Sequence, residues 1–318
     1  MESMMNMALA QRNTGNIDEA IDLLLEVIRK RKIILGLNHP ETARAIFALA
    51  STYRDDLRLT EAGTLLNEAI EIQTRILGIE HQDTLSSLDN LAWVSERQGR
   101  LTKAETLYNE ATEIQTRMFG VKHKSTLRAM HQLAAVYEQQ GRFTEAENLY
   151  NKIIKTKMLD NDLDASFTMH NLARMYERQN RLTESEEPYK AVIRIREKAF
   201  GGDDLVALRS CCGLADVYLK LGRLGEAEQL GMRLLEQYQK ILGLEHPETL
   251  DRKRFLAIMS WKSGRKEEAI IRMDECVALY SRVMGRDHRD TLSASETLTH
   301  WKAKVETEIV RPDVGSSV

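Results

Sequence analysis

The sequence has few cysteines, prolines and aromatic residues. Its 318 residues include three cysteines, four prolines, seventeen glycines and 6% aromatic residues. Cys211, Cys212 and Cys276 show neither a metal-type spacing nor a paired framework, which fits a reducing intracellular compartment. The low content of aromatic residues, proline and glycine disfavours a β-sandwich or a barrel.

Strong charge and long apolar runs are also lacking. The net charge of -3 gives no electrostatic footprint for nucleic acid or for an anionic membrane. No stretch approaches the ~18 apolar residues of a spanning helix, and the N-terminal MESMMNMALAQRN lacks the apolar core of a signal peptide. We therefore expect a cytoplasmic protein that binds neither nucleic acid nor membrane.

A leucine-type position recurs along the whole chain. It is occupied by Met7, Leu49, Leu91, Leu133, Leu172, Leu214, Leu256 and Leu298, at steps of 42 residues with a single step of 39 from Leu133 to Leu172. In the first seven repeats alanine follows it, a glycine or its equivalent stands eight residues after it, and a small residue follows five further on. So many features in one phase predict tandem structural repeats.

Each period predicts two helices, called helix A and helix B below. In residues 84–98 and 102–119 the apolar residues follow the i, i+3, i+4, i+7 spacing of a helix. Gly99 and its equivalents supply the left-handed conformation that ends helix A. Most connectors to the next helix A read Gly-x-x-His-x-x-Thr-Leu, whereas the 39-residue step falls in KMLDNDLDASF and predicts a shorter loop there.

The expected fold is all-α: a right-handed α-solenoid of about seven helix-turn-helix repeats with a C-terminal capping helix. We expect residues 1–304 to form a single superhelical domain, followed by a flexible tail over residues 305–318. The predicted repeats span about 1–35, 36–77, 78–119, 120–158, 159–200, 201–242 and 243–284, and the capping helix spans 289–304.

The segments LGLNHPETA, LGIEHQDTL and LGLEHPETL, with DNLAWVSERQGRLTKAETLYNEA and ADVYLKLGRLGEAEQL, resemble the tetratricopeptide repeat (TPR). The resemblance is greater to the 42-residue type found in kinesin light chains and in the C-terminal arrays of fungal and bacterial NLR-like signalling ATPases. It implies a binding array with protein or peptide partners. No Gly-x-x-x-x-Gly-Lys-Ser/Thr motif accompanies it, so we expect neither a nucleotide-binding domain nor a cofactor.

Five of the eight histidines share one connector position: His39, His81, His123, His246 and His288. A residue that recurs with the repeat serves the repeat. We therefore interpret these histidines as structural residues that fix the turn before helix A, and not as ligands.

The candidate binding residues lie on a second stripe of helix A, which faces the concave side in this family and varies from repeat to repeat. The stripe contains Phe47, Asn90, Trp93, Arg128, His131, Gln132, His170, Asn171, Arg174, Arg209, Asp216, Arg254 and Trp261. Aromatic residues, including Phe255, are candidates for apolar anchors. The arginines either meet acidic groups of a partner or form weak salt bridges between repeats, and both interpretations stay open.

The resemblance also implies a role for one amide position. In kinesin light chains the asparagine before Leu-Ala hydrogen-bonds the backbone of an extended peptide. Asn6, Asn90 and Asn171 match it, and Gln132 is similar. Ala48, Gly213 and Phe255 depart from it, which puts an uninterrupted peptide track in doubt.

The row Asp89, His131, His170 and Cys212 suggests an alternative function. A carboxylate, two imidazoles and a thiol are the ingredients of general acid–base chemistry or of a metal site. Helices packed at ~8–10 Å separate these side chains too far for a zinc site without inward leaning. The sequence thus favours a scaffold without a metal over an enzyme or small-molecule pocket around His131 and His170, and self-association through the first repeat is a third possibility.

Overall fold

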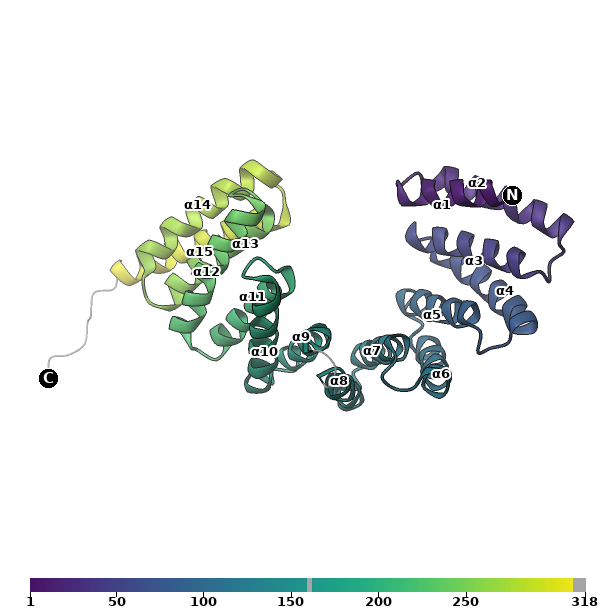
Figure 1. The fold of residues 1–318 in the computed structure, drawn as a ribbon. Coiled ribbons are helices and arrows are strands. Elements are labelled where there is room, and N and C mark those ends of the chain that lie inside the picture. The colour runs from purple at the N-terminus through teal and green to yellow at the C-terminus, as the bar shows by residue number, and fades with distance from the viewer. Residues whose placement is uncertain (159–161, 311–318) are drawn as a thin grey trace. The chain divides into compact units, whose positions relative to one another are not determined.

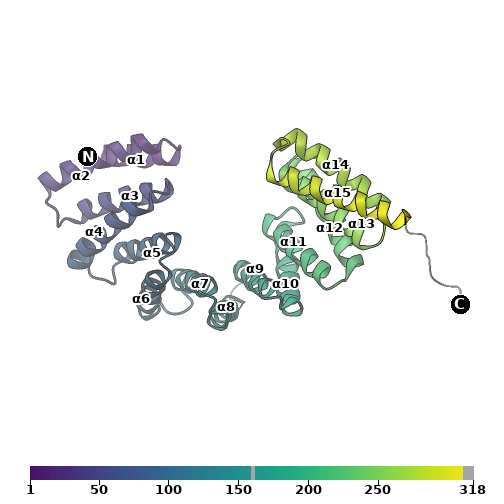
Figure 2. The ribbon, with the colours of Figure 1, turned by 180° about the vertical axis from the view of Figure 1, so that it is seen from behind.

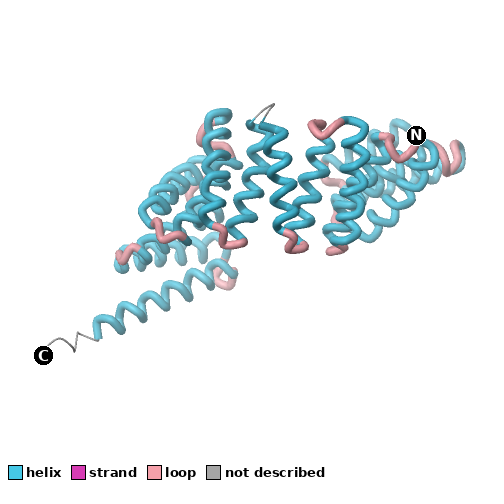
Figure 3. Tube along the Cα trace, turned by 90° about the horizontal axis from the view of Figure 1, so that it is seen from below, coloured by secondary structure: helices cyan, strands magenta, loops and turns pink. Residues whose placement is uncertain are grey.

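The computed structural model describes residues 1–158 and 162–310, which form fifteen α-helices and no strand (Figure 3). The chain divides into two compact units, Met1–Asp160 and Asn161–Val318. Within each unit, every helix packs mainly on the helices that precede and follow it in sequence (Figure 1). The prediction of an all-α solenoid built from helix pairs is confirmed.

The first unit contains α1 (Glu2–Asn13), α2 (Ile17–Ile34), α3 (Pro40–Asp55), α4 (Leu59–Leu77), α5 (Gln82–Arg97), α6 (Leu101–Phe119), α7 (Lys124–Gln139) and α8 (Phe143–Met158). The second unit contains α9 (Asp162–Arg178), α10 (Leu182–Phe200), α11 (Leu205–Lys220), α12 (Leu224–Leu242), α13 (Pro247–Lys262), α14 (Lys266–Met284) and α15 (Arg289–Val310). Odd-numbered helices are helices A and even-numbered helices are helices B. The prediction that residues 1–304 form a single domain stays a prediction.

Helix α15 is longer than the sequence suggested. We expected it to end at residue 304 and a flexible tail to follow, but the helix continues to Val310. An ion pair between Lys266 of α14 and Glu308 stabilises this extra length, which the weak apolar period of the segment did not reveal. Residues 311–318 of the expected tail, and residues 159–161 of the shortened connector, lie outside the described residues.

The repeated leucines and alanines form the core of each unit. Leu49, Leu91 and Leu133 of the leucine row are buried, as are Ala62 and Ala104 on helices B. Small side chains at these positions allow two helix axes to approach closely. The core is thus a ladder of equivalent contacts, one for each repeat.

The end of helix A requires a left-handed backbone conformation in every repeat. Gly99 has a φ of 73° at this position. In two repeats the position is not glycine, yet Leu57 adopts a φ of 58° and Asn180 a φ of 60°. Because an ordinary side chain disfavours this region, the packing of helix A on helix B determines the conformation and the residue accommodates it.

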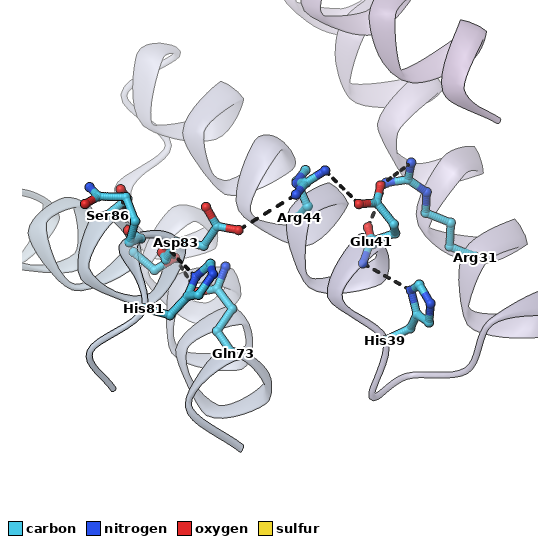
Figure 4. A network of polar contacts seen from close by, with 10 residues as sticks. Arg31, His39, Glu41, Arg44, Gln73, His81, Asp83 and Ser86 are labelled. Atoms are coloured by element: carbon cyan, nitrogen blue, oxygen red, sulfur yellow. Dashed lines mark hydrogen bonds and ion pairs between the residues drawn. The ribbon is translucent and has the colours of Figure 1, made fainter. Parts of the chain in front are cut away.

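The connector histidines cap helix A. The Nδ1 atoms of His39 and His81 accept a hydrogen bond from the backbone N–H two residues later, at 3.2 and 3.1 Å (Figure 4). His123, His246 and His288 make the same bond at 3.3 Å. The structural interpretation of these five histidines is confirmed, since each satisfies one of the free N–H groups at a helix start.

One repeat performs the same task with a different residue. Asp204 precedes α11, and its Oδ1 accepts hydrogen bonds from the backbone N–H groups of Val206 and Ala207 at 3.1 and 2.9 Å. A hydrogen bond from Arg196, together with these backbone bonds, lowers the pKa of the Asp204 carboxyl. Aspartate is therefore an adequate replacement for histidine at this position.

This equivalence predicts the effect of two substitutions at His81. His81→Ala removes the acceptor, and we expect it to lower the free energy of unfolding by about 1 kcal/mol. His81→Asp supplies an acceptor with a favourable charge at the helix start, and should preserve stability. Urea unfolding of the full chain, followed by circular dichroism, measures both. His300→Ala, in the middle of α15, is the control; equal losses for the alanine and aspartate variants of His81 would contradict the capping role.

Candidate functional site

The candidate residues of the first unit lie on the helices A. Helices α3, α5 and α7 follow one another along one side of this unit, and α4, α6 and α8 follow along the other (Figures 1 and 2). Equivalent positions of neighbouring repeats thus form rows that cross the helices. The rows contain Asp89, Asn90 and Trp93 on α5, and His131 and Gln132 on α7.

A depression of about 180 Å³ opens on this side, and we call it the α5 pocket. It is lined by Arg54 of α3, Asp89, Asn90 and Trp93 of α5, Tyr108 of α6, and Arg128, Ala129 and Gln132 of α7. Four of the predicted groove residues therefore come together here: Asn90, Trp93, Arg128 and Gln132.

The amide of Asn90 is held in place at one edge of the α5 pocket. Its Nδ2 donates to the carbonyl oxygen of Ser86 at 2.7 Å, and its Oδ1 accepts from the guanidinium of Arg54. That guanidinium lies 5.8 Å from the centre of the Trp93 ring. A side-chain amide has two N–H donors and an oxygen that accepts twice, so Asn90 keeps hydrogen-bonding capacity for a ligand.

Asp89 lies deeper in the same pocket. Its Oδ2 forms an ion pair with Arg128 at 2.7 Å; the aspartate side chain is 13% exposed and the arginine side chain 64%. Burial raises the pKa of the Asp89 carboxyl, although Arg128 opposes this shift. Tyr108, almost fully buried, lies beneath the pocket, and burial raises the pKa of its hydroxyl.

The two candidate histidines have separate environments. The ring of His131 packs at 5.5 Å from the ring of Tyr150 and does not line the α5 pocket. In the second unit, His170 Nδ1 lies 2.9 Å from Ser210 Oγ, and the serine hydroxyl donates to the carbonyl oxygen of Val206. The imidazole must therefore donate from Nδ1. Burial, with Arg174 and Arg209 nearby, lowers the pKa of His170 to about 4, so it is neutral at pH 7.

His170 and Arg209 correspond by register to Asp89 and Arg128 of the first unit. Asp89 and Arg128 form an ion pair, but the neutral His170 offers no carboxylate to Arg209. Arg209 and Arg174 are both exposed. The equivalent positions thus hold an aspartate paired with an arginine in the first unit and a neutral histidine near an arginine in the second.

In the described residues, the four side chains of the row Asp89, His131, His170 and Cys212 have separate partners. Cys212 Sγ lies 3.8 Å from the Tyr238 hydroxyl, and burial raises the pKa of its thiol. Asp89 pairs with an arginine, and each histidine packs against a tyrosine ring. Within residues 1–158 and 162–310, no three His, Cys, Asp or Glu side chains are placed to hold a metal ion.

The remaining candidates of the second unit are largely engaged in packing. Asn171 is only 9% exposed, and burial raises the pKa of the half-buried Asp216 carboxyl. Arg254 donates to Ser293 Oγ at 2.9 Å. Trp261 stacks on Trp301 of α15 with ring centres 4.6 Å apart and an angle of 1° between the planes. The capping helix therefore covers much of the surface that Trp261 was expected to offer.

Phe47 and Phe255 were predicted as apolar anchors, and the structure corrects this for Phe255. Phe255 is buried in the core beside Leu256 and Met259. Phe47 is half-buried and packs on the same core cluster as Trp93. The variable stripe of helix A is thus partly a packing surface.

The residue before Leu-Ala is an amide in Asn90, Gln132 and Asn171, and we call this the amide row. It is interrupted where a large side chain on one helix faces a glycine on its neighbour, which we call a size exchange. A Cβ atom added to Gly213 would lie 2.4 Å from Cζ of Tyr189 on the preceding helix B. In the next repeat the order is reversed, because a Cβ on Gly231 of helix B would lie 2.9 Å from Phe255. In these two repeats a ring fills the space beside the partner glycine, and no amide stands before Leu-Ala. Where Tyr108 and Gln132 meet, both large side chains are accommodated.

The sequence analysis did not identify Tyr108 as part of the site. The sequence does show that the helix-B position of Tyr108 recurs in the other repeats. It is occupied there by Leu66, Tyr150, Tyr189, Gly231 and Met273. Most of these are large and buried, as a packing residue should be. Only the structure shows that this row lies directly beneath the amide row.

In the part of the chain that the structure describes, no helix is long and apolar enough to cross a membrane.

The size exchange can be tested at Gly213. We expect Gly213→Ala to lower the free energy of unfolding by roughly 1–3 kcal/mol, because the added methyl overlaps the Tyr189 ring. Tyr189→Leu combined with Gly213→Ala should recover part of this loss, and thermal unfolding of the single and double variants measures the coupling. Gly225→Ala, which meets open space, is the control; additive losses in the double variant would refute the contact.

Comparisons with known proteins agree with this architecture. A family model described as tetratricopeptide repeat matches residues 48–117, 95–157, 164–240 and 211–282, and a second model with the same description matches residues 1–41. No curated protein sequence matches the chain significantly.

Among solved structures, nearly identical TPR-like repeats assigned to a kinesin light chain of Podosopora anserina are 26% identical, with a TM-score of 0.57 over 64% of this chain and 98% of that one. A tetratricopeptide repeat protein from Parabacteroides merdae is 18% identical, with a TM-score of 0.57 over 95% and 98% of the two chains. A signal transduction ATPase with a tetratricopeptide repeat sensor from Pyrococcus horikoshii is 14% identical, with a TM-score of 0.70 over 94% and 44%. The latter two show a common fold. The family matches cover most of the sequence, so the chain belongs to the tetratricopeptide-repeat family, and its repeats are of the kinesin-light-chain-like type.

Proposed function

We propose that this protein is an interaction scaffold that binds an extended peptide or protein segment along its helices A, with the α5 pocket as a principal contact. TPR repeats generally mediate protein–protein interactions, and this chain is such a repeat scaffold. We propose in addition that the helix-A surface is the binding surface and that the partner is an extended segment.

The observation that carries the proposal is the composition of the α5 pocket. Asn90 and Gln132, at the same repeat position on neighbouring helices, both line it beside the indole of Trp93. A side-chain amide can donate to a peptide carbonyl and accept from a peptide N–H. Two such amides next to an aromatic face are suited to a peptide backbone and an adjacent apolar side chain.

The fixed position of Asn90 supports the same conclusion. Its bonds to Arg54 and to the carbonyl of Ser86 hold the amide in one orientation before a ligand arrives. Less side-chain freedom is then lost on binding, which favours affinity. The role of the equivalent asparagine in kinesin light chains, which the sequence resemblance implies, agrees with this arrangement.

The amide row also suggests where binding ends. Ala48 precedes it on α3, and the Tyr189–Gly213 and Gly231–Phe255 contacts interrupt it in the second unit. Asn171 is mostly buried. We therefore assign most of the binding energy to Asn90, Gln132 and Trp93. No observation on the described residues favours the alternative pocket around His131 and His170.

Selection of peptides tests this proposal. A random twelve-residue library displayed on phage would be selected against the immobilised full chain, and the affinity of the recovered peptides measured by fluorescence anisotropy. We expect Asn90→Ala with Gln132→Ala to weaken binding by at least about tenfold, the equivalent of 1.4 kcal/mol, because one or two hydrogen bonds to the peptide are lost.

A matched control is available on helix B. Asn109 of α6 has the same chemistry but does not line the α5 pocket. Asn109→Ala should leave the affinity unchanged. Recovery of no peptide, or equal effects of the helix-A and helix-B variants, would refute binding along helices A.

A further inference from the structure

Three buried polar atoms lie in the α5 pocket or next to its lining: Asp89 and Tyr108 line it, and Gln115 neighbours Asp89. Asp89 Oδ1, Tyr108 Oη and Gln115 Oε1 are buried and have no hydrogen-bond partner among the described residues. They have polar neighbours, since hydrogen-bonding contacts from Gln115 to Asp89 and from Gln132 to Tyr108 lower the pKa values of the two groups. None of the three atoms, however, makes a well-formed hydrogen bond within 3.5 Å. Buried polar atoms are normally paired, so these three atoms have hydrogen-bonding capacity for a group that enters the α5 pocket.

The preceding repeat contains a hydrogen bond that has no equivalent at Gln115. There, Gln73 Oε1 accepts a hydrogen bond of 2.7 Å from the hydroxyl of Ser87, and Gln73 appears in Figure 4. Gln115 is the equivalent of Gln73, but Ala129 replaces the serine. Ala129 also lines the α5 pocket. The repeat that contains Gln115 therefore lacks this internal donor, next to the α5 pocket.

The orphan atoms define the chemistry of that ligand. Asp89 Oδ1 and Gln115 Oε1 only accept, while the Tyr108 hydroxyl is able to donate. A primary carboxamide has two N–H donors and one carbonyl acceptor, which matches this set in number and kind. The space of about 180 Å³ holds about six groups of the size of a water molecule, enough for such a side chain.

Other side chains fit less well. Arg54 would repel a lysine or arginine, and a cation that replaced Arg128 on Asp89 would only exchange one ion pair for another. An acidic side chain would face the Asp89 carboxylate. An aliphatic side chain would fill the space but leave all three polar atoms unpaired, at the cost of their desolvation.

Access to the floor requires the side chain of Arg128 to move. Arg128 is 64% exposed and holds the Asp89 carboxylate from the solvent side. An ion pair with one partner this exposed contributes little. Because the Asp89 carboxylate is mostly buried, the incoming carboxamide must donate to it in place of Arg128.

We propose that the α5 pocket receives the side-chain carboxamide of an asparagine or glutamine in the bound segment, which hydrogen-bonds Asp89, Tyr108 and Gln115. This inference rests on the proposed function and adds to it the residue type that the pocket selects.

The peptides recovered by selection on the full chain test the inference directly. We expect asparagine or glutamine to be enriched at one position of the aligned peptides. Replacing that residue by leucine, glutamate or lysine should weaken binding at least tenfold. The relevant peptide position is the one whose replacement loses its effect when the α5 pocket is mutated. Enrichment of an acidic, basic or aliphatic residue at this position would overturn the inference. The proposed function would still stand if Asn90→Ala weakened binding. Recovery of no peptide would overturn both.

Two variants separate a binding role from a structural one. Ala129→Ser restores the donor found in the preceding repeat, so it should raise the thermal midpoint and weaken binding of the amide-containing peptide. Tyr108→Phe removes an unpaired hydroxyl, so it should leave the midpoint unchanged or raised and reduce the preference for glutamine over leucine about tenfold. Tyr189→Phe is the matched control: its hydroxyl donates to Glu177 at 3.1 Å, so we expect a lower midpoint and unchanged peptide binding. A lower midpoint for Tyr108→Phe, with an unchanged glutamine preference, would contradict the inference.

Discussion

The contact between helix B of one repeat and helix A of the next determines the rest of this structure. Where α6 meets α7, α10 meets α11 and α12 meets α13, a residue in the middle of helix B lies beside the residue that precedes Leu-Ala on the following helix. The two side chains share one space of limited volume, because protein interiors are close-packed. Tyr189 with Gly213, and Gly231 with Phe255, show the two extremes of this complementarity.

In the proposed function, the same contact determines which helix-A positions carry a side chain that can meet a ligand. Where the pair is Tyr108 and Gln132, both side chains reach the α5 pocket and the upper one is an amide. Where the pair contains a glycine, the ring of the partner occupies the space, and the position no longer carries a side chain for recognition. Under the proposed function, varying one packing pair is enough to create a binding site, and the helices themselves need not change.

Much of this fold is predictable from the sequence because local rules determine it. The period locates the helices, the glycine equivalents end helix A, and the five connector histidines are structural, as their capping bonds confirm. The burial of Phe255, the stacking of Trp261 on Trp301 and the position of Tyr108 beneath Asn90 and Gln132 depend on contacts between helices. A single sequence shows the period of such residues but not their partners. The extra length of α15 depends likewise on an ion pair with α14.

The central claim is that an extended segment lies across the helices A of the first unit and enters the α5 pocket. Photo-cross-linking tests it most directly: a selected peptide with a diazirine at each position in turn is irradiated with the full chain, and the linked residues are identified by mass spectrometry. The account predicts cross-links to α5 and α7, near Asn90, Trp93 and Gln132. Cross-links confined to the solvent-facing sides of α4, α6 or α8 would contradict it.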